Sequence, residues 1–250
     1  MEYIKFGSGQ KTLVIIPGLS IKSVMLSAEA IEAAYSCFAQ DYTVYLFDRK
    51  KEVGRRYTVK QMARDTISAI HLLGLKDIYL FGTSQGGMIC QFIAAFEPEL
   101  VKKMILASTA SSVKTDRKSA VASWTALAKK GDVKALVSSF AELCYSKETV
   151  AACMQTIMDA HKDVSQEELK KFLVLAKGAR SFSSERVLGR IKCPVFVIGT
   201  KSDKVLGGEA SERLAQKLGC RLFMYENYGH AVYDEAPDYK HRMMDFFDGE

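Results

Sequence analysis

The chain has 250 residues, of which 48% are hydrophobic and 26% are charged. This is enough apolar sequence for a sizeable buried core, and it argues against a disordered or fibrous protein. The formal net charge of +6 comes from 35 basic and 29 acidic residues spread along the chain. Because no basic cluster repeats at a spacing that would follow a phosphate backbone, we expect no nucleic-acid partner.

The amino-terminal residues lack the apolar segment of a secretory signal, and no stretch approaches the ~18 apolar residues of a membrane span. We therefore expect a cytoplasmic protein with no membrane partner. The six cysteines lie far apart, form no C-x-x-C pair and mostly fall in apolar periodic segments. We interpret them as reduced core residues rather than disulfides or metal ligands.

Short β-branched and aromatic runs alternate with longer segments of helical period, which is typical of a mostly parallel central sheet flanked by helices. The predicted strands cover residues 3–6, 12–16, 43–47, 78–81, 103–107, 195–198 and 222–225. The predicted helices cover residues 24–39, 59–73, 86–96, 208–218 and 236–247. Gly74 is expected to end the second helix in a left-handed conformation.

Residues 111–189 interrupt this alternation, because they show helical periodicity and no convincing strand. Asp132 precedes one predicted helix, and Ser165 with Glu168 forms a capping box for another. An insertion that follows a parallel strand lies at the carboxyl edge of the sheet, where ligands bind. We therefore predict an α/β core of residues 1–110 and 190–250 and an all-helical cap of residues 111–189. A helical oligomerisation module is the alternative, and the oligomeric state stays open.

The motif G-x-S-x-G occupies residues 82–86, between a predicted strand and a predicted helix. Such a tight turn forces Ser84 into a strained conformation with its hydroxyl above the sheet, and side chains at positions 82 and 86 would collide. Ser84 would also lie at a helix N-terminus, where unpaired N–H groups favour developing negative charge. We predict Ser84 to be a nucleophile. The alternative is that its side chain only caps the helix.

A serine nucleophile needs a histidine base, and the chain has four histidines. His71, His161 and His241 lie within segments of helical period. His230 instead follows a predicted strand, in a loop at the carboxyl end of the sheet, where Ser84 is also expected. We therefore predict His230 to be the base.

The acid that orients the histidine is predicted to be Asp203, which directly follows a buried strand and lies between Ser84 and His230 in the chain. This order of nucleophile, acid and histidine is the one expected for a nucleophile on a strand-turn-helix. Glu226 and Asp234 are nearer to His230 in the sequence, but each would have to fold back to meet the ring. They are the weaker candidates.

The oxyanion of a tetrahedral intermediate needs two N–H donors. One is predicted to be the backbone amide of Gln85, which follows the nucleophile. The other is predicted to be the amide of Leu19, in the Pro17-Gly18-Leu19 turn after the strand 12–16.

Together these motifs resemble the α/β-hydrolase superfamily along essentially the whole chain. The similar segments are Ile16-Pro17-Gly18-Leu19, Leu46-Phe47-Asp48-Arg49, residues 82–86, residues 194–203 and Gly229-His230. The resemblance implies the α/β-hydrolase fold, with Ser84, Asp203 and His230 as the triad and residues 111–189 as a cap over the pocket. Departures from the family pattern at Pro17, Thr200 and residues 50–53 leave the subfamily open.

We expect a serine hydrolase that forms an acyl-enzyme, with small or medium carboxylic esters as small-molecule substrates. Lactonase, thioesterase, aminopeptidase and carbon–carbon hydrolase or lyase activities are the alternatives within the superfamily. A non-catalytic ligand-binding receptor is the alternative from another class. No metal or organic cofactor is expected, because the chain has no metal-ligand spacing, P-loop or dinucleotide fingerprint.

Overall fold

The computed structural model describes residues 1–113, 119–180 and 182–249. Within these residues one seven-stranded sheet has the order β1-β3-β2-β4-β5-β6-β7, and only the β1–β3 pairing is antiparallel. Its strands are β1 (Tyr3–Phe6), β2 (Lys11–Ile16), β3 (Tyr42–Phe47), β4 (Ile78–Thr83), β5 (Val101–Ala107), β6 (Val195–Thr200) and β7 (Arg221–Tyr225). The predicted α/β class is confirmed, and each predicted strand is present with its ends moved by at most two residues.

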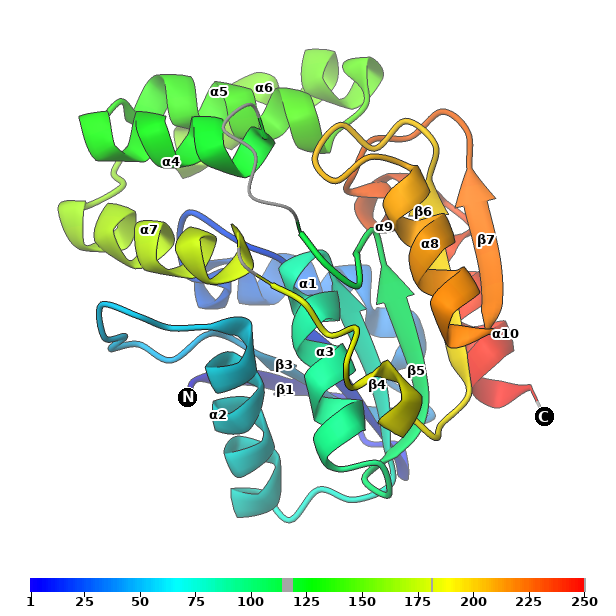
Figure 1. Cartoon of the computed structure of the whole chain (residues 1–250). Helices are drawn as coiled ribbons and strands as arrows, with labels where there is room; N and C mark the ends of the chain where they lie inside the picture. The colour runs from blue at the N-terminus through cyan, green and yellow to red at the C-terminus, as the bar shows by residue number, and fades with distance from the viewer. Residues whose placement is uncertain (114–118, 181, 250) are drawn as a thin grey trace.

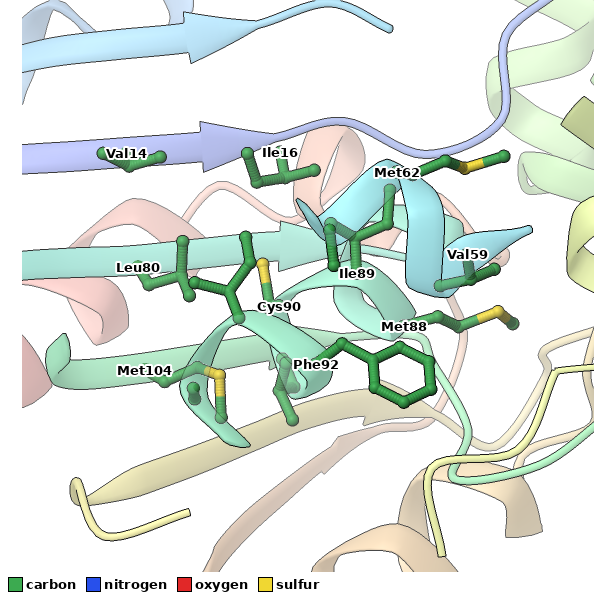
Figure 2. Close-up of a cluster of buried hydrophobic side chains, with 14 of the residues drawn as sticks. Val14, Ile16, Val59, Met62, Leu80, Met88, Ile89, Cys90, Phe92 and Met104 are labelled. Atoms are coloured by element: carbon green, nitrogen blue, oxygen red, sulfur yellow. The ribbon is translucent and has the colours of Figure 1, made fainter. Parts of the chain in front are cut away.

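Helices cover both faces of the sheet (Figure 1). Along β2, Val14 and Ile16 belong to one apolar core with α2 (Val59–Leu72), α3 (Gln85–Phe96) and α8 (Glu209–Leu218). Leu13 and Ile15 belong to a second core with α10 (Tyr239–Asp248) and the segment around α1 (Ala28–Ala34). Figure 2 shows part of the first core, where side chains of β2, β4 and β5 meet those of α2 and α3. Burial on both faces explains why the central strands are apolar at nearly every position.

Two predicted helices are wrong in extent. The range 24–39 is divided into η1 (Val24–Ser27), α1 and η2 (Ser36–Phe38), which lets the buried rings of Tyr35 and Phe38 both enter the second core. The range 236–247 begins only at Tyr239, after the short helix α9 (Val232–Glu235). Ala236 is extended because the next residue is proline, which disfavours helical geometry in the residue before it.

In the described residues between β5 and β6, four α-helices form what we call the helical insertion: α4 (Ala120–Lys130), α5 (Val133–Cys144), α6 (Lys147–Ala160) and α7 (Gln166–Arg180). The arrowheads of β5 and β7 point toward it (Figure 1). The predicted caps are confirmed: Asp132 accepts the amide of Ala135 at 3.0 Å, and Ser165 and Glu168 each accept the other's backbone N–H.

The helical insertion supplies most of a third apolar core, to which Trp124, Leu136 and Phe172 contribute, and Ile21 and Ala231 from outside the insertion join it. Of the predicted range 111–189, residues 114–118 and 181 lie outside the described residues. The division of the chain into a core and a cap stays a prediction.

The prediction for Gly74 is confirmed, and the prediction for the cysteines is wrong in part. Gly74 has a φ of 67°, as predicted for the end of α2. Cys90 and Cys144 are buried, but Cys37 and Cys153 are exposed, so the interpretation of the cysteines as core residues is wrong for these two. Over the described ranges, no helix is both long enough and apolar enough to cross a bilayer.

Candidate active site

Ser84 occupies the turn between β4 and α3 with a φ of 49° and a ψ of −118°. A non-glycine residue adopts such a conformation only when its surroundings impose it. The Ser84 N–H donates to the carbonyl of Ala107 at 2.8 Å. The Ser84 carbonyl accepts from the Met88 N–H at 3.1 Å and from the Thr109 hydroxyl at 2.8 Å. These bonds hold the turn in its strained form.

The two glycines of the motif each leave room for one specific neighbour. A Cβ atom at Gly86 would lie 1.9 Å from the carbonyl oxygen of Ile16, and one at Gly82 would lie 2.4 Å from Sγ of Cys90. Real Cβ atoms do not approach other atoms so closely. Glycine is therefore required at both positions by the packing of the turn against β2 and α3.

Asp203 and His230 form a buried pair. The Nδ1 atom of His230 lies 2.8 Å from Oδ2 of Asp203, and their side chains are 3% and 2% exposed. Oδ1 of Asp203 accepts the amides of Val205 and Leu206 at 2.8 and 3.0 Å. Burial by itself raises the pKa of Asp203, but the nearby His230 and these hydrogen bonds outweigh burial and lower it.

The ionised state of Asp203 decides the tautomer of His230. A carboxylate only accepts hydrogen bonds, so Nδ1 of His230 carries the hydrogen of the 2.8 Å bond. In the neutral ring Nε2 is then left as the acceptor. His230 is thereby held in the form that a general base requires.

The other acids considered from the sequence do not bond His230. Glu226 is exposed and pairs with Lys201 at 2.7 Å, and Asp234 lies 3.5 Å from the hydroxyl of Tyr145.

No group of three or more metal-ligating side chains occurs in the part of the chain that the structure describes.

The other three histidines lie elsewhere. His71 is on α2, 3.9 Å from Glu97, and His241 is exposed on α10. His161 follows α6, and its Nδ1 lies 2.8 Å from the carbonyl oxygen of Ile157. His230 is the histidine that shares a cavity with Ser84.

Ser84 and His230 both line a cavity of about 60 Å³, which we call the Ser84 cavity. Much of the remaining wall is apolar and comes from α3, β6–α8 and the helical insertion: Met88, Leu206, Trp124 and Phe140 are among its residues. The rings of Trp124 and Phe140 lie 4.5 Å apart. Both rings also pack in the apolar core of the helical insertion.

The turn that carries Leu19 lies beside Ser84. Leu19 and Gln85 both line the Ser84 cavity, and a Cβ atom at Gly18 would lie 3.3 Å from Cβ of Ser84. Nη2 of the buried Arg49 donates to the carbonyl of Pro17 at 2.5 Å and so supports this turn. Sequence reasoning assigned no role to Arg49, because only the tertiary structure brings it to Pro17.

The Gln85 side chain joins the turn that carries Ser84 to the helical insertion. Its Nε2 donates to the carbonyl of Leu175 on α7 at 2.8 Å, and the residue is almost fully buried. The same helix reaches the end of β3 through Lys171, whose Nζ lies 3.9 Å from the Asp48 carboxylate.

The loop that carries the histidine is also attached to the helical insertion. The N–H of Ala231 donates to the carbonyl of Cys144 at 2.7 Å. The carboxylate of Glu235 accepts the N–H of Gly229 at 2.8 Å and that of Ser146 at 2.9 Å, so it bridges the loop to the start of α6. Sequence reasoning missed Glu235, because no local pattern relates it to residues about ninety positions away.

Comparisons with known proteins identify the family of this chain and several relatives. The sequence profile of the serine aminopeptidase family S33 matches residues 8–237. A protein described as the carbamate hydrolase RutD, from Pseudomonas savastanoi pv. phaseolicola, is 23% identical over 226 residues, which cover 86% of this chain and 87% of that protein. The human monoacylglycerol lipase ABHD6 is 26% identical over 177 residues, which cover 66% of this chain and 52% of the lipase.

The fold has solved counterparts. The crystal structure of MGS-M2, an α/β-hydrolase enzyme from a Medee basin deep-sea metagenome library, superposes with a TM-score of 0.86. The superposition covers 100% of this chain and 94% of that one at 21% sequence identity. The chain therefore belongs to the serine aminopeptidase family S33 and is an enzyme of the α/β-hydrolase class.

Proposed function

We propose that the protein is a serine hydrolase that cleaves small or medium carboxylic esters through an acyl-enzyme on Ser84. The observation that carries the proposal is the buried Asp203–His230 pair, joined at 2.8 Å, whose histidine lines the same cavity as the strained Ser84. A serine that only capped α3 would need neither partner, and the side chain of Ser84 makes no capping hydrogen bond.

In the acylation step, Nε2 of His230 takes the proton of the Ser84 hydroxyl while Oγ forms a bond to the ester carbonyl carbon. The carbonyl oxygen becomes an oxyanion, which accepts hydrogen bonds from the amides of Leu19 and Gln85. The bond from carbon to the alcohol oxygen then breaks, and the imidazolium of His230 returns its proton to the leaving alcohol. Asp203 stabilises the positive charge that the ring carries in between.

In the deacylation step, a water molecule repeats the attack on the acyl-enzyme. His230 takes the proton of this water, and the bond from the acyl carbon to Ser84 Oγ breaks. His230 then protonates Oγ, which restores the serine and releases the carboxylic acid.

We infer that the helical insertion acts as a cap that limits the size of the acyl group. Trp124 and Phe140 supply part of the apolar wall of the Ser84 cavity, and both belong to the insertion. A cavity of about 60 Å³ suits a short acyl chain better than a long one. This favours acetate to butyrate esters over long-chain esters.

The match to a protein described as a carbamate hydrolase favours a second candidate, cleavage of a carbamate. The same groups would attack a carbamate carbonyl with the same proton transfers. The two candidates differ in the atoms bound to the carbonyl carbon, so a panel that includes both kinds of substrate separates them.

A fluorophosphonate probe tests the proposal, because it phosphonylates an activated serine. We expect intact-protein mass spectrometry to show one added probe on the wild type, and we expect hydrolysis of p-nitrophenyl acetate and butyrate. Both should be lost in Ser84→Ala and His230→Ala. Ser68→Ala is the matched control, because Ser68 is on α2 and bonds only the carbonyl of Arg64 there.

If folded wild type were labelled no faster than Ser84→Ala, the protein would be a ligand-binding receptor rather than an enzyme of this type. Near-normal turnover by His230→Ala would show that another group is the base.

A further inference from the structure

A second, larger cavity of about 340 Å³ lies beside the Ser84 cavity. We call it the Asp234 cavity. The two cavities share five lining residues: Gly18, Leu19, Phe140, Tyr145 and Tyr233. The shared wall includes Leu19, whose amide is the proposed oxyanion donor. One substrate can therefore extend into both cavities with its scissile carbonyl between them.

Among the residues that line this cavity, Asp234 is the single carboxylate, no lysine or arginine occurs, and His161 is the single histidine, with its Nδ1 held 2.8 Å from the carbonyl oxygen of Ile157. Its nearest polar partner is the hydroxyl of Tyr145 at 3.5 Å, which is a weak hydrogen bond. Within the described ranges, no basic side chain lies within 4 Å of this carboxylate. The nearby Lys240 instead donates to the Tyr233 carbonyl at 2.5 Å.

Aromatic rings line the same cavity. Phe140, Tyr145 and Tyr233 are in the wall shared with the Ser84 cavity, and Tyr35 lies in the remainder. The faces of such rings attract cations. Tyr35 already has the Lys240 ammonium 5.2 Å from its ring centroid, which leaves the other three for a ligand.

These features distinguish between the possible ligand groups. An anionic group would be repelled by Asp234. A neutral apolar group would strip water from the carboxylate without replacing it, which is unfavourable. An organic ammonium group would pair with the carboxylate and contact the rings. Asp234 is solvent-exposed, but the protein atoms around it remove part of its hydration, and this raises its pKa to about 6, although Lys240 and Tyr145 act in the opposite direction.

The Asp234 cavity suits the alcohol part of an ester. The alcohol leaves first, after acylation, and needs a path to solvent. Asp234 is solvent-exposed, whereas His230 at the Ser84 cavity is buried. The smaller Ser84 cavity is left for the acyl group.

We propose that the Asp234 cavity binds an organic ammonium group on the alcohol part of the substrate, with Asp234 as the counter-ion and the rings of Phe140, Tyr145 and Tyr233 around it. This inference rests on the proposed ester hydrolysis, of which it names the substrate class.

Choline and 3,3-dimethylbutan-1-ol test the proposal, because they have nearly the same shape and differ in charge. Their affinities are measured by calorimetry on Ser84→Ala protein, and fluorescence of Trp124, the single tryptophan, gives a second readout. We expect choline to bind about tenfold more tightly. Asp234→Asn in the same background should reduce this preference below about threefold.

Asp245→Asn is the matched control, because it removes the same charge from an exposed position on α10. It should keep the full preference for choline. Equal binding of choline and the neutral alcohol would overturn the proposal without any variant, so misfolding of Asp234→Asn cannot hide a failure. An unchanged preference in folded Asp234→Asn would also overturn it.

Turnover separates this inference from the proposed function. With wild-type enzyme we expect kcat/KM for butyrylcholine to exceed that for 3,3-dimethylbutyl butyrate by about tenfold. If p-nitrophenyl butyrate is hydrolysed but butyrylcholine has no advantage, the ester hydrolase stands and the ammonium site fails. If no ester is hydrolysed, the proposed function fails, and the binding measurements still decide whether the cavity selects a cation.

Discussion

The turn that carries Ser84 and the loop that carries His230 meet at one cavity, but the contacts that orient their side chains differ. The turn is held by close packing: the positions of Gly82 and Gly86 have no room for a Cβ atom. The histidine loop is also closely packed at Gly229, where a Cβ atom would lie 2.4 Å from the carbonyl oxygen of Cys144, but polar contacts to Asp203 and Glu235 orient its ring and backbone. Steric fit within a core is part of the stability of the fold, whereas a hydrogen bond to a loop mainly decides where one side chain points. Damage to the turn should therefore destabilise the protein, and damage to the loop should slow catalysis while the protein stays folded.

The largest expected effect is that of Asp203→Asn, which changes a polar contact of the histidine loop. The asparagine oxygen can still accept the amides of Val205 and Leu206, so its NH₂ group would face Nδ1 of His230 and favour the wrong tautomer. We expect kcat for p-nitrophenyl butyrate to fall about 10⁴-fold. Thermal unfolding should still show one cooperative transition.

Glu226→Gln is the control for Asp203→Asn, because Glu226 bonds Lys201 rather than the histidine. A loss of turnover in Glu226→Gln with normal rates in Asp203→Asn would mean that the acid has been misassigned.

The next largest effect is expected from Gly86→Ala, which disturbs the close packing of the turn that carries Ser84. The added methyl group would have to displace the end of β2, whose Ile16 carbonyl lies 1.9 Å from the Cβ position. We expect a loss of about 3 kcal/mol in the free energy of unfolding, measured by urea titration. Gly189→Ala should change it by less than about 1 kcal/mol, because no heavy atom lies within 4 Å of that position. Equal effects of the two substitutions would show that close packing does not hold the turn.

A smaller effect is expected from Glu235→Gln. Each carboxylate oxygen of Glu235 accepts one backbone N–H, from Gly229 or from Ser146. In glutamine an NH₂ group replaces one of these oxygens, so one of the two N–H groups would lose its acceptor. The histidine loop should move relative to the helical insertion, and kcat should fall about tenfold, or about 1.4 kcal/mol, with little change in KM. Glu142→Gln, an exposed change on α5, is the control. A changed KM with normal kcat would assign Glu235 to substrate binding instead.

The smallest expected effect is on the pH dependence of stability, to which Asp234 contributes. The pKa of Asp234 is raised to about 6, against about 3.9 for an aspartate in an unfolded chain. Between these values the folded state holds the proton more tightly, so the contribution of Asp234 to stability falls as pH rises from about 4 to about 6. Loss of hydration causes the shift and Glu235 adds to it, whereas Lys240 and Tyr145 reduce it.

In Asp234→Asn this contribution is absent. The unfolding temperature of the variant should therefore rise relative to that of the wild type across the same pH interval. Asp245→Asn should follow the wild type at each pH. A difference between Asp234→Asn and wild type that is the same at pH 4 and pH 7 would rule out this origin.

Local patterns were sufficient to predict the strands and to select Asp203 and His230, which the structure places within hydrogen-bond distance. β6 was predicted from a run of apolar residues because a strand that is buried on both faces has no polar side to show. Asp203 and His230 were found because each follows a strand, and parallel strands bring their carboxyl ends to one edge. The predicted helix 24–39 failed because its periodicity did not reveal that Tyr35 and Phe38 both turn into the core.

The sequence by itself determined the α/β class, the position of the nucleophile turn and the small set of residues able to form a triad, because strand periodicity and tight-turn chemistry act over a few neighbouring residues. Only the tertiary structure decided that Asp203 bonds His230, that Arg49 supports the Pro17 turn, that Glu235 links the histidine loop to α6, and that Asp234 lines a cavity beside the nucleophile. Those contacts join segments far apart in the chain. Each depends on how sheet and insertion pack together, which no local pattern encodes.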